Sequence, residues 1–235
     1  MQMSPRALGR MAGVFEALEG LASAFGQVMI LGRLVVSGDP AATAANILGH
    51  ERLFWLGFAL SVLGVIFHLA WALLFYELFK PVNRRVSLYA VFVILVGCAI
   101  QAVTALLYLA PFFVLQSASS LKAFMPEQLQ ALAFAFVRLN ARAFDLYLVF
   151  FGLWCLLSGY LIFRSTFLPR ILGVLLAIDG VAWMTYIVPP VGRALFPVIA
   201  VASGLAEIPL QLWLIVFGVN PERWKEQARA VEERQ

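Results

Sequence analysis

Charged residues are scarce in this sequence, and so are cysteine and histidine. Only 13% of the 235 residues are charged and 63% are hydrophobic, whereas a soluble domain has about 25% charged residues. The cysteines, Cys98 and Cys155, have no paired spacing, which argues against a disulfide framework or a thiolate metal site. The histidines, His50 and His68, are too few for a histidine-rich hydrolase or a bis-histidine haem site. The composition therefore excludes an ordinary soluble domain.

Long apolar segments make up most of the chain, and six reach the roughly 20 residues needed to cross about 30 Å of hydrocarbon. We predict an all-α membrane protein, a polytopic bundle of six transmembrane helices with short interfacial helices. It forms one transmembrane domain over residues 1–220, followed by a charged tail over residues 221–235. The predicted spans are about 11–31, 53–79, 87–116, 143–163, 171–189 and 195–217.

Turn and cap residues mark the connections between these spans. Asp39 is placed to cap a short helix that runs to about Leu48 and ends at Gly49. A helix that starts at Pro126 and continues to Phe163 would be far longer than the bilayer. We therefore expect either a surface-lying amphipathic helix over about residues 126–140, or a long helix that bends before the fourth span.

The basic residues orient the predicted bundle. Eleven of the 17 Lys and Arg residues lie in the N-terminus, the second loop, the fourth loop and the tail, and six lie on the other side. By the positive-inside rule both termini are cytoplasmic, and we predict a multi-pass protein of a bacterial inner membrane. Because these bases flank spans, the net charge of +4 indicates no nucleic-acid partner.

Four acidic residues interrupt the apolar spans: Glu16, Glu19, Asp179 and Glu207. A charged group at the bilayer centre costs about 3 kcal/mol or more, so intramembrane acids usually have a function. Glu77 is different, because it lies one turn from the end of its span beside Lys80 and is expected at the surface.

Helical spacing places the other polar residues of the spans on single faces. Glu16, Glu19, Ser23 and Gln27 form one stripe, and Glu207 shares a face with Ser203 and Gln211. We predict that His68, Gln101, Asp179 and Glu207, which lie near the midpoints of their spans, meet in one polar centre. The aromatic or polar residues expected to line that centre and bind substrate are Phe67, Trp71, Phe75, Tyr108, Trp183, Tyr186, Gln101, Gln211 and His68.

Five short strings in the chain carry a family resemblance. They are ATAANI (42–47), KPVNR (80–84), PEQLQAL (126–132), GYLI (159–162) and LPRILG (168–173). Together they resemble a bacterial, largely actinobacterial, six-helix membrane family known as a domain of unknown function, over nearly the whole chain. The resemblance implies the fold and no activity. The sequence departs from the family pattern at Glu16, Glu19 and Asp179, where apolar residues or tyrosine are usual.

A buried acid beside aromatic side chains suits one reaction class. Burial favours the neutral form of a carboxyl group, which then acts as a general acid, and π-faces stabilise carbocations. In size and layout the chain is similar to the small integral-membrane terpene cyclases of meroterpenoid and prenylated-indole pathways. That likeness implies metal-independent, cofactor-free cyclisation of a lipophilic prenyl substrate, with Asp179 or Glu207 as the proton donor. Glu16 or Glu19 would polarise the donor, supply its proton or be the acid itself.

Other functions fit the same acids. A proton-coupled transporter or a lipophilic-ligand-binding membrane protein would use them as a cation or proton site, although the chain lacks the internal repeat common in transporters. Six spans would then imply a homodimer. A metal site would draw its ligands from Glu16, Glu19, His68, Asp179 and Glu207. A purely structural role explains the buried acids least well.

Overall fold

The computed structural model describes residues 3–117 and 123–233 as helices joined by short connections, with no strand among them. Six helical segments are long and apolar enough to cross a membrane, which confirms the predicted fold class. The last two residues of the predicted tail lie outside the described residues. The spanning segments are Pro5–Leu34, Glu51–Phe79, Arg84–Gln116, Pro126–Arg164, Arg170–Ile187 and Pro189–Val216.

The first span is a compound helix. It consists of α1 (Pro5–Ser23), a π-helix η1 (Ala24–Leu31) and a short α2 (Gly32–Leu34). The next element, α3 (Pro40–Gly49), begins where the sequence predicts, because Asp39 Oδ1 accepts a hydrogen bond from the Ala42 N–H at 2.9 Å. The cap satisfies one of the backbone donors that a helix start leaves unpaired.

The middle of the chain forms three long helices, α4 (Glu51–Phe79), α5 (Arg84–Gln116) and α6 (Pro126–Arg164). At 39 residues, α6 is continuous from the proline that starts it. The expectation of a separate surface helix over residues 126–140 was therefore wrong. No glycine or proline interrupts the sequence after Pro126 until Gly152, so nothing in the backbone ends the helix earlier.

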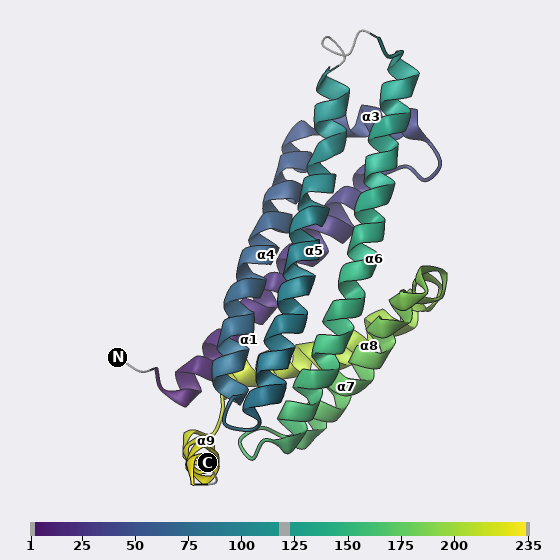
Figure 1. Ribbon diagram of the computed structural model, residues 1–235. Coiled ribbons are helices and arrows are strands. Elements are labelled where there is room, and N and C mark those ends of the chain that lie inside the picture. Colours follow the sequence, from purple (N-terminus) through teal and green to yellow (C-terminus); the bar gives the residue numbers. More distant parts are fainter. Residues whose placement is uncertain (1–2, 118–122, 234–235) are drawn as a thin grey trace. The chain divides into compact units, whose positions relative to one another are not determined.

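Two shorter helices follow, α7 (Arg170–Met184) with a 3₁₀ turn η3 (Thr185–Ile187), and α8 (Pro189–Val216). They pack against each other along their length (Figure 1). Pro189 begins α8, since a proline at the first helical position lacks only an N–H that would be unpaired there. Gly218 ends α8 with a φ of 67°, which a residue with a side chain rarely adopts.

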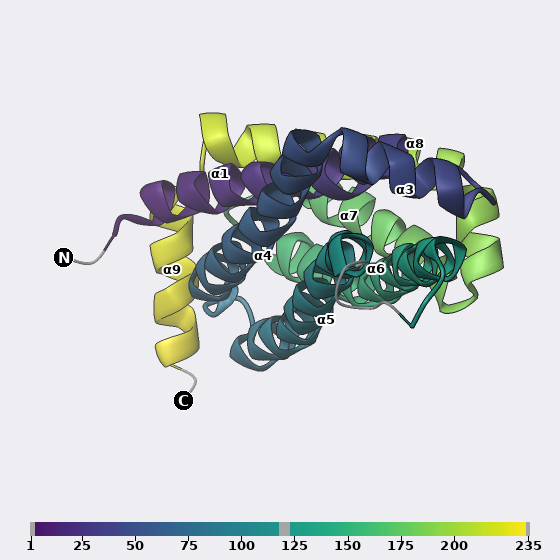
Figure 2. The same ribbon diagram turned by 90° about the horizontal axis from the view of Figure 1, so that it is seen from above.

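The tail contains an ordered helix, α9 (Pro221–Glu232), capped by the Asn220 side chain. Its Trp224 Nε1 donates a hydrogen bond to the carbonyl of Leu78 at the end of α4, 2.8 Å away. Figure 2 shows α9 from above, beside the start of α1. The charged tail is thus a docked helix. The sequence analysis described it by charge alone.

Contacts divide the chain into two compact units that share several helices. Unit 1 comprises Met1–Leu18, Phe67–Cys98 and Asp145–Gln235, and unit 2 comprises Glu19–Ile66 and Ala99–Phe144. The single transmembrane domain predicted for residues 1–220 stays a prediction. Each unit carries its own buried polar group, and the candidate site is described unit by unit.

Candidate functional site

Paired glycines bring α6 and α7 into backbone contact in unit 1. A Cβ added to Gly173 would lie 2.5 Å from the Gly159 carbonyl oxygen, and one added to Gly180 would lie 2.6 Å from that of Gly152. The glycines are seven residues apart on each helix, so they recur on one face at every second turn. Small residues of this kind let membrane helices approach closely. The close approach places Cys155 of α6 beside Asp179 of α7.

Asp179 is the most enclosed acid in the structure, with no solvent exposure. Its Oδ1 accepts a hydrogen bond from Ser203 Oγ of α8. Cys155, Trp183 and Glu207 also lie within interaction distance of this carboxyl group. Ser203 therefore holds one oxygen, and a thiol, an indole and a second carboxyl group surround the same side chain.

Two more acids complete what we call the carboxyl cluster, defined as Glu16, Asp179 and Glu207. The fully buried Cys155 thiol interacts electrostatically with all three. Glu16 of α1 is 5% exposed and Glu207 of α8 is half-buried. Like charges that interact in a low-dielectric interior disfavour one another's ionised form. The prediction that Asp179 and Glu207 lie together agrees with this arrangement.

Aromatic rings pack next to the carboxyl cluster and form what we call the aromatic cluster. His68 lies 4.7 Å from Trp71, and Trp71 lies 4.3 Å from Trp154, between ring centroids. Trp183, beside Asp179, is 6.3 Å from Phe151. Trp183 therefore joins the rings to the acids. The members are His68, Trp71, Phe75, Tyr147, Phe151, Trp154, Trp183 and Tyr186.

Gln101, a predicted member of the polar centre, belongs to unit 2 instead, where it contacts Glu19. Glu19 Oε1 accepts hydrogen bonds from Ser23 Oγ at 2.8 Å and from Gln101 Nε2 at 3.1 Å. Beside this group is a cavity of about 10 Å³ lined by Ser23, Gln27, Ser61, Gln101, Thr104 and Phe144. A polar cavity of that size has room for about one water molecule. Gln101 thus donates its hydrogen bond to Glu19, and both residues belong to unit 2.

The remaining predicted substrate residues have separate positions. Tyr108 is buried in the core of unit 2, 4.9 Å from the Phe54 ring. Gln211 lies on α8 one turn beyond Glu207 and is half-buried, and its carbonyl oxygen faces Gly13 of α1. Phe67 of unit 1 packs against Phe15 with their centroids 6.1 Å apart.

The sequence analysis did not assign the residues that α6 contributes. Tyr147, Phe151, Trp154, Cys155 and Ser158 recur at helical spacing, and all five are buried. The regular spacing of the aromatic residues on this helix is the sequence signal that identifies them.

Comparison with protein-family models identifies the family of the chain. A family model for a domain of unknown function, DUF4386, matches residues 11–218. The chain belongs to the DUF4386 family. The match extends over all six spanning helices and stops before α9. No curated protein and no solved structure matches the chain.

No group of three or more His, Cys, Asp and Glu side chains within residues 3–117 and 123–233 is placed to hold a metal ion. His68, one of the ligands considered, stacks among aromatic rings. Another, Glu19, lies in unit 2.

Proposed function

We propose that this protein is a membrane-bound terpene cyclase in which Asp179 protonates a prenyl chain. The observation that carries the proposal is the setting of the Asp179 carboxyl group. It is fully buried, accepts a hydrogen bond from the Ser203 hydroxyl, and lies within interaction distance of Cys155, Trp183 and Glu207. Burial disfavours the charged form of a carboxyl group, and the neutral form can donate a proton.

The neighbouring groups support the steps that follow protonation. The Asp179 proton adds to the CH carbon of the terminal alkene, whose π electrons form the new C–H bond and leave the positive charge on the dimethyl-substituted carbon. The tertiary carbocation is then captured by the π electrons of the next double bond, which closes a ring. The rings of Trp183, Phe151 and Trp154 would stabilise the cation through their π-faces.

The reaction ends when the cyclic cation loses a proton to a carboxylate and a double bond forms again. We assign this base to Glu207, which interacts with Asp179. Glu207 is then protonated and Asp179 is ionised, and a proton transfer inside the carboxyl cluster restores the starting state. Glu16 belongs to the same cluster and would connect it to bulk protons. The overall reaction is an isomerisation and consumes no cofactor.

The test uses purified full-length protein in detergent and a linear farnesylated aromatic acceptor. Cyclisation predicts a product with the mass of the substrate and fewer alkene protons, formed equally well in the presence of a chelator. In D₂O each product molecule should gain one deuterium, because the initiating proton is exchangeable and the departing proton comes from the substrate. Asp179→Asn and Glu207→Gln should stop turnover at unchanged expression, and Glu77→Gln is the matched control. If both variants cyclise at the wild-type rate, the proposal is wrong.

A second candidate, proton-coupled transport or binding of a lipophilic ligand, is favoured by the complete burial of Asp179. A site that carries only a proton needs no room for a prenyl chain. Transport would appear as substrate-dependent proton flux in liposomes, lost in Asp179→Asn, with the substrate chemically unchanged. The cyclase and the transporter are thereby distinguished by the mass and NMR spectrum of the recovered substrate.

We also propose the cellular setting: a bacterial cytoplasmic membrane, with both termini cytoplasmic and a prenylated small molecule reaching the site from the lipid. Basic residues gather at one end of the spans, which supports this orientation. A C-terminal fluorescent-protein fusion should fluoresce, and a C-terminal alkaline phosphatase fusion should be inactive. A homodimer belongs to the transport alternative, and cross-linking in membranes would detect it.

A further inference from the structure

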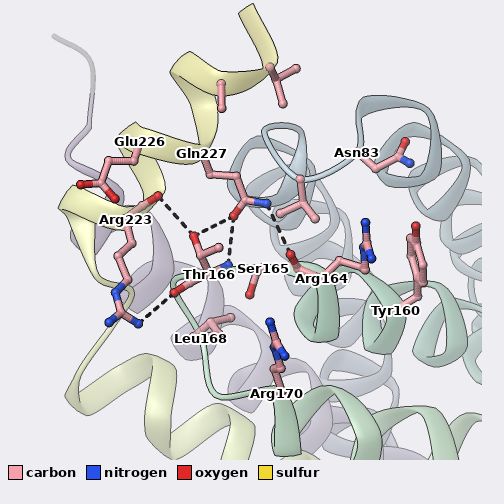
Figure 3. A pocket seen from close by; sticks show the side chains of 13 residues that line it. Asn83, Tyr160, Arg164, Ser165, Thr166, Leu168, Arg170, Arg223, Glu226 and Gln227 are labelled. Atoms are coloured by element: carbon pink, nitrogen blue, oxygen red, sulfur yellow. Dashed lines mark hydrogen bonds between the residues drawn. The ribbon is translucent and has the colours of Figure 1, made fainter. Parts of the chain in front are cut away.

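A second site lies at the end of the spans in unit 1, away from the carboxyl cluster. A pocket of about 850 Å³ is enclosed by the end of α6, the loop from α6 to α7, the α4–α5 connection and one face of α9 (Figure 3). Ligand pockets commonly measure roughly 300–1,000 Å³. The pocket is therefore large enough for a small molecule or a lipid headgroup.

Hydrogen bonds between α9 and the α6–α7 loop build the wall of this pocket. Gln227 Oε1 accepts from both the Thr166 N–H and the Thr166 hydroxyl, each at 3.0 Å, and its Nε2 donates to the Arg164 carbonyl at 3.4 Å. Arg223 Nη1 donates to the Thr166 carbonyl at 3.3 Å (Figure 3). Together with the Trp224–Leu78 hydrogen bond, these contacts hold α9 over the loop.

The lining carries an excess of positive charge. Arg164, Arg170 and Arg223 line the pocket with a single acid, Glu226, and none of the four forms an ion pair with a described residue. Arg164 and Arg170 are solvent-exposed. Arginine binds phosphate oxygens through paired N–H donors.

The position of the pocket suggests where its ligand comes from. Arg164 is the last residue of α6 and Arg170 the first of α7, so both lie where spans end. Tyr160, one turn inside α6, and the apolar Leu168 and Val231 also line it. A wall that is cationic at the end of a span and apolar beside it matches a phospholipid at the headgroup level.

We propose that this pocket binds a phosphate-bearing anion, held by Arg164 and Arg170 beneath α9. The group is either the headgroup of an anionic phospholipid or a soluble phosphate ester, since both present the same oxygens. The inference does not depend on the cyclase proposal, because no residue of the carboxyl cluster lines the pocket.

The experiment measures binding of single lipids to the full-length protein in detergent by native mass spectrometry, with phosphatidylglycerol and phosphatidylcholine titrated separately. Detergent removes the membrane surface potential, so a preference for phosphatidylglycerol reports a site on the protein. Inorganic phosphate and glycerol phosphate are then added as soluble competitors. We expect phosphatidylglycerol to bind roughly 30-fold more tightly than phosphatidylcholine, since about 1 kcal/mol is gained for each of the two arginines.

The double variant R164Q/R170Q should weaken phosphatidylglycerol binding about 30-fold, because two contacts are lost. The matched control is R84Q/R85Q. It removes the same charge from exposed arginines at the start of α5, outside the pocket, and should change binding less than about threefold by the same reasoning. Ala230→Trp keeps every charge and fills the pocket, so it should also abolish binding and serves if R164Q/R170Q does not fold.

Each outcome decides the question. Phosphatidylglycerol binding that depends on the pocket and is not displaced by millimolar glycerol phosphate identifies a lipid site. Displacement by glycerol phosphate or inorganic phosphate identifies a soluble phosphate ester as the ligand. Equal losses in the two double variants, binding retained in Ala230→Trp, or no binding of any probe would overturn the proposal. These results are independent of turnover at Asp179.

Discussion

Glu19 in unit 2 and Asp179 in unit 1 are both buried carboxyl groups in apolar helices, and their surroundings differ in kind. Glu19 Oε1 accepts hydrogen bonds from Ser23 and Gln101, two neutral donors. Asp179 accepts one, from Ser203, and lies within interaction distance of a thiol, an indole and a second carboxyl group. Hydrogen bonds from neutral donors stabilise the charged form of a carboxyl group, whereas a neighbouring acid disfavours that form and competes for the same proton. Burial alone therefore does not identify the reactive acid.

The contrast also separates two residues that the sequence pairs. Glu16 and Glu19 lie on one face of α1, three residues apart, and either one was expected to polarise the proton donor, supply its proton or act as the acid. Glu16 interacts with the Cys155 thiol in unit 1, and Glu19 bonds within unit 2. We therefore assign proton supply to Glu16 and give Glu19 the role of joining helices.

The largest expected difference between the Asp179 and Glu19 carboxyl groups is in their effect on turnover. Asp179→Asn removes the proposed acidic proton and should lower the cyclisation rate by at least about 10³-fold, within the range for a general acid. Glu19→Gln keeps a hydrogen-bonding group in unit 2 and should change the rate less than about tenfold by the same argument. Initial rates on the farnesylated acceptor measure both. Similar losses in the two variants would remove the distinction drawn between them.

The second comparison concerns glycines near each group. Gly173→Ala should destabilise the protein by roughly 1–3 kcal/mol, because its Cβ would lie 2.5 Å from the Gly159 carbonyl oxygen. Gly20→Ala, next to Glu19, meets no atom within 4 Å and should stabilise α1 by up to about 1 kcal/mol. Thermal unfolding in detergent gives both values. A stable Gly173→Ala protein would mean that α6 and α7 separate easily.

A third test sharpens the assignment of Glu19. Gln101→Leu removes the donor to Glu19 Oε1 and should cost about 0.6–1.7 kcal/mol, the measured range for hydrogen bonds between membrane helices. A double-mutant cycle with Glu19→Gln and Gln101→Leu isolates this coupling. Turnover should be unaffected in all three proteins. A coupling near zero would contradict the role of Glu19 in joining helices.

The smallest effect is expected at an exposed pair that belongs to neither group. Lys80 Nζ lies 2.7 Å from Glu77 Oε2, with the two side chains 41% and 42% exposed. Glu77→Gln should change stability by less than about 0.5 kcal/mol, because solvent and salt screen such pairs. Unfolding at low and high salt measures this. A larger, salt-independent loss would show that Glu77 acts beyond the surface pair.

Local chemistry explains which parts of the fold the sequence predicted. Asp39 and Gly49 bound a short helix through side-chain capping and backbone freedom, both of which act within a few residues. The spans follow from apolar length. The continuous α6 did not follow, because an amphipathic stretch before a span is compatible with either a bend or a straight helix. The docking of α9 depends on long-range hydrogen bonds from Arg223, Trp224 and Gln227, and these have no local signal.

The candidate site was likewise predicted from the sequence only where neighbouring residues lie on the same helix. Helical spacing placed Asp179 beside Trp183 and Glu207 beside Ser203, because those pairs are one turn apart. Depth along a span was used to group Gln101 with them, and depth does not specify which neighbour a side chain faces. Cys155 was overlooked because it is uncharged. Cys155 lies beside Asp179 because Gly152 and Gly159 allow α7 to approach α6 closely, and this long-range contact has no signal in the local sequence.

The shortness of the fifth span has a consequence for the lipid around it. Arg170–Ile187 contains 18 residues, which at about 1.5 Å per residue gives roughly 27 Å, slightly less than the usual hydrocarbon thickness. Arg170 begins α7 and Pro189 begins α8 just beyond the segment, so few residues are left to extend it. We therefore expect bilayers of shorter acyl chains to match the helix that carries Asp179 best.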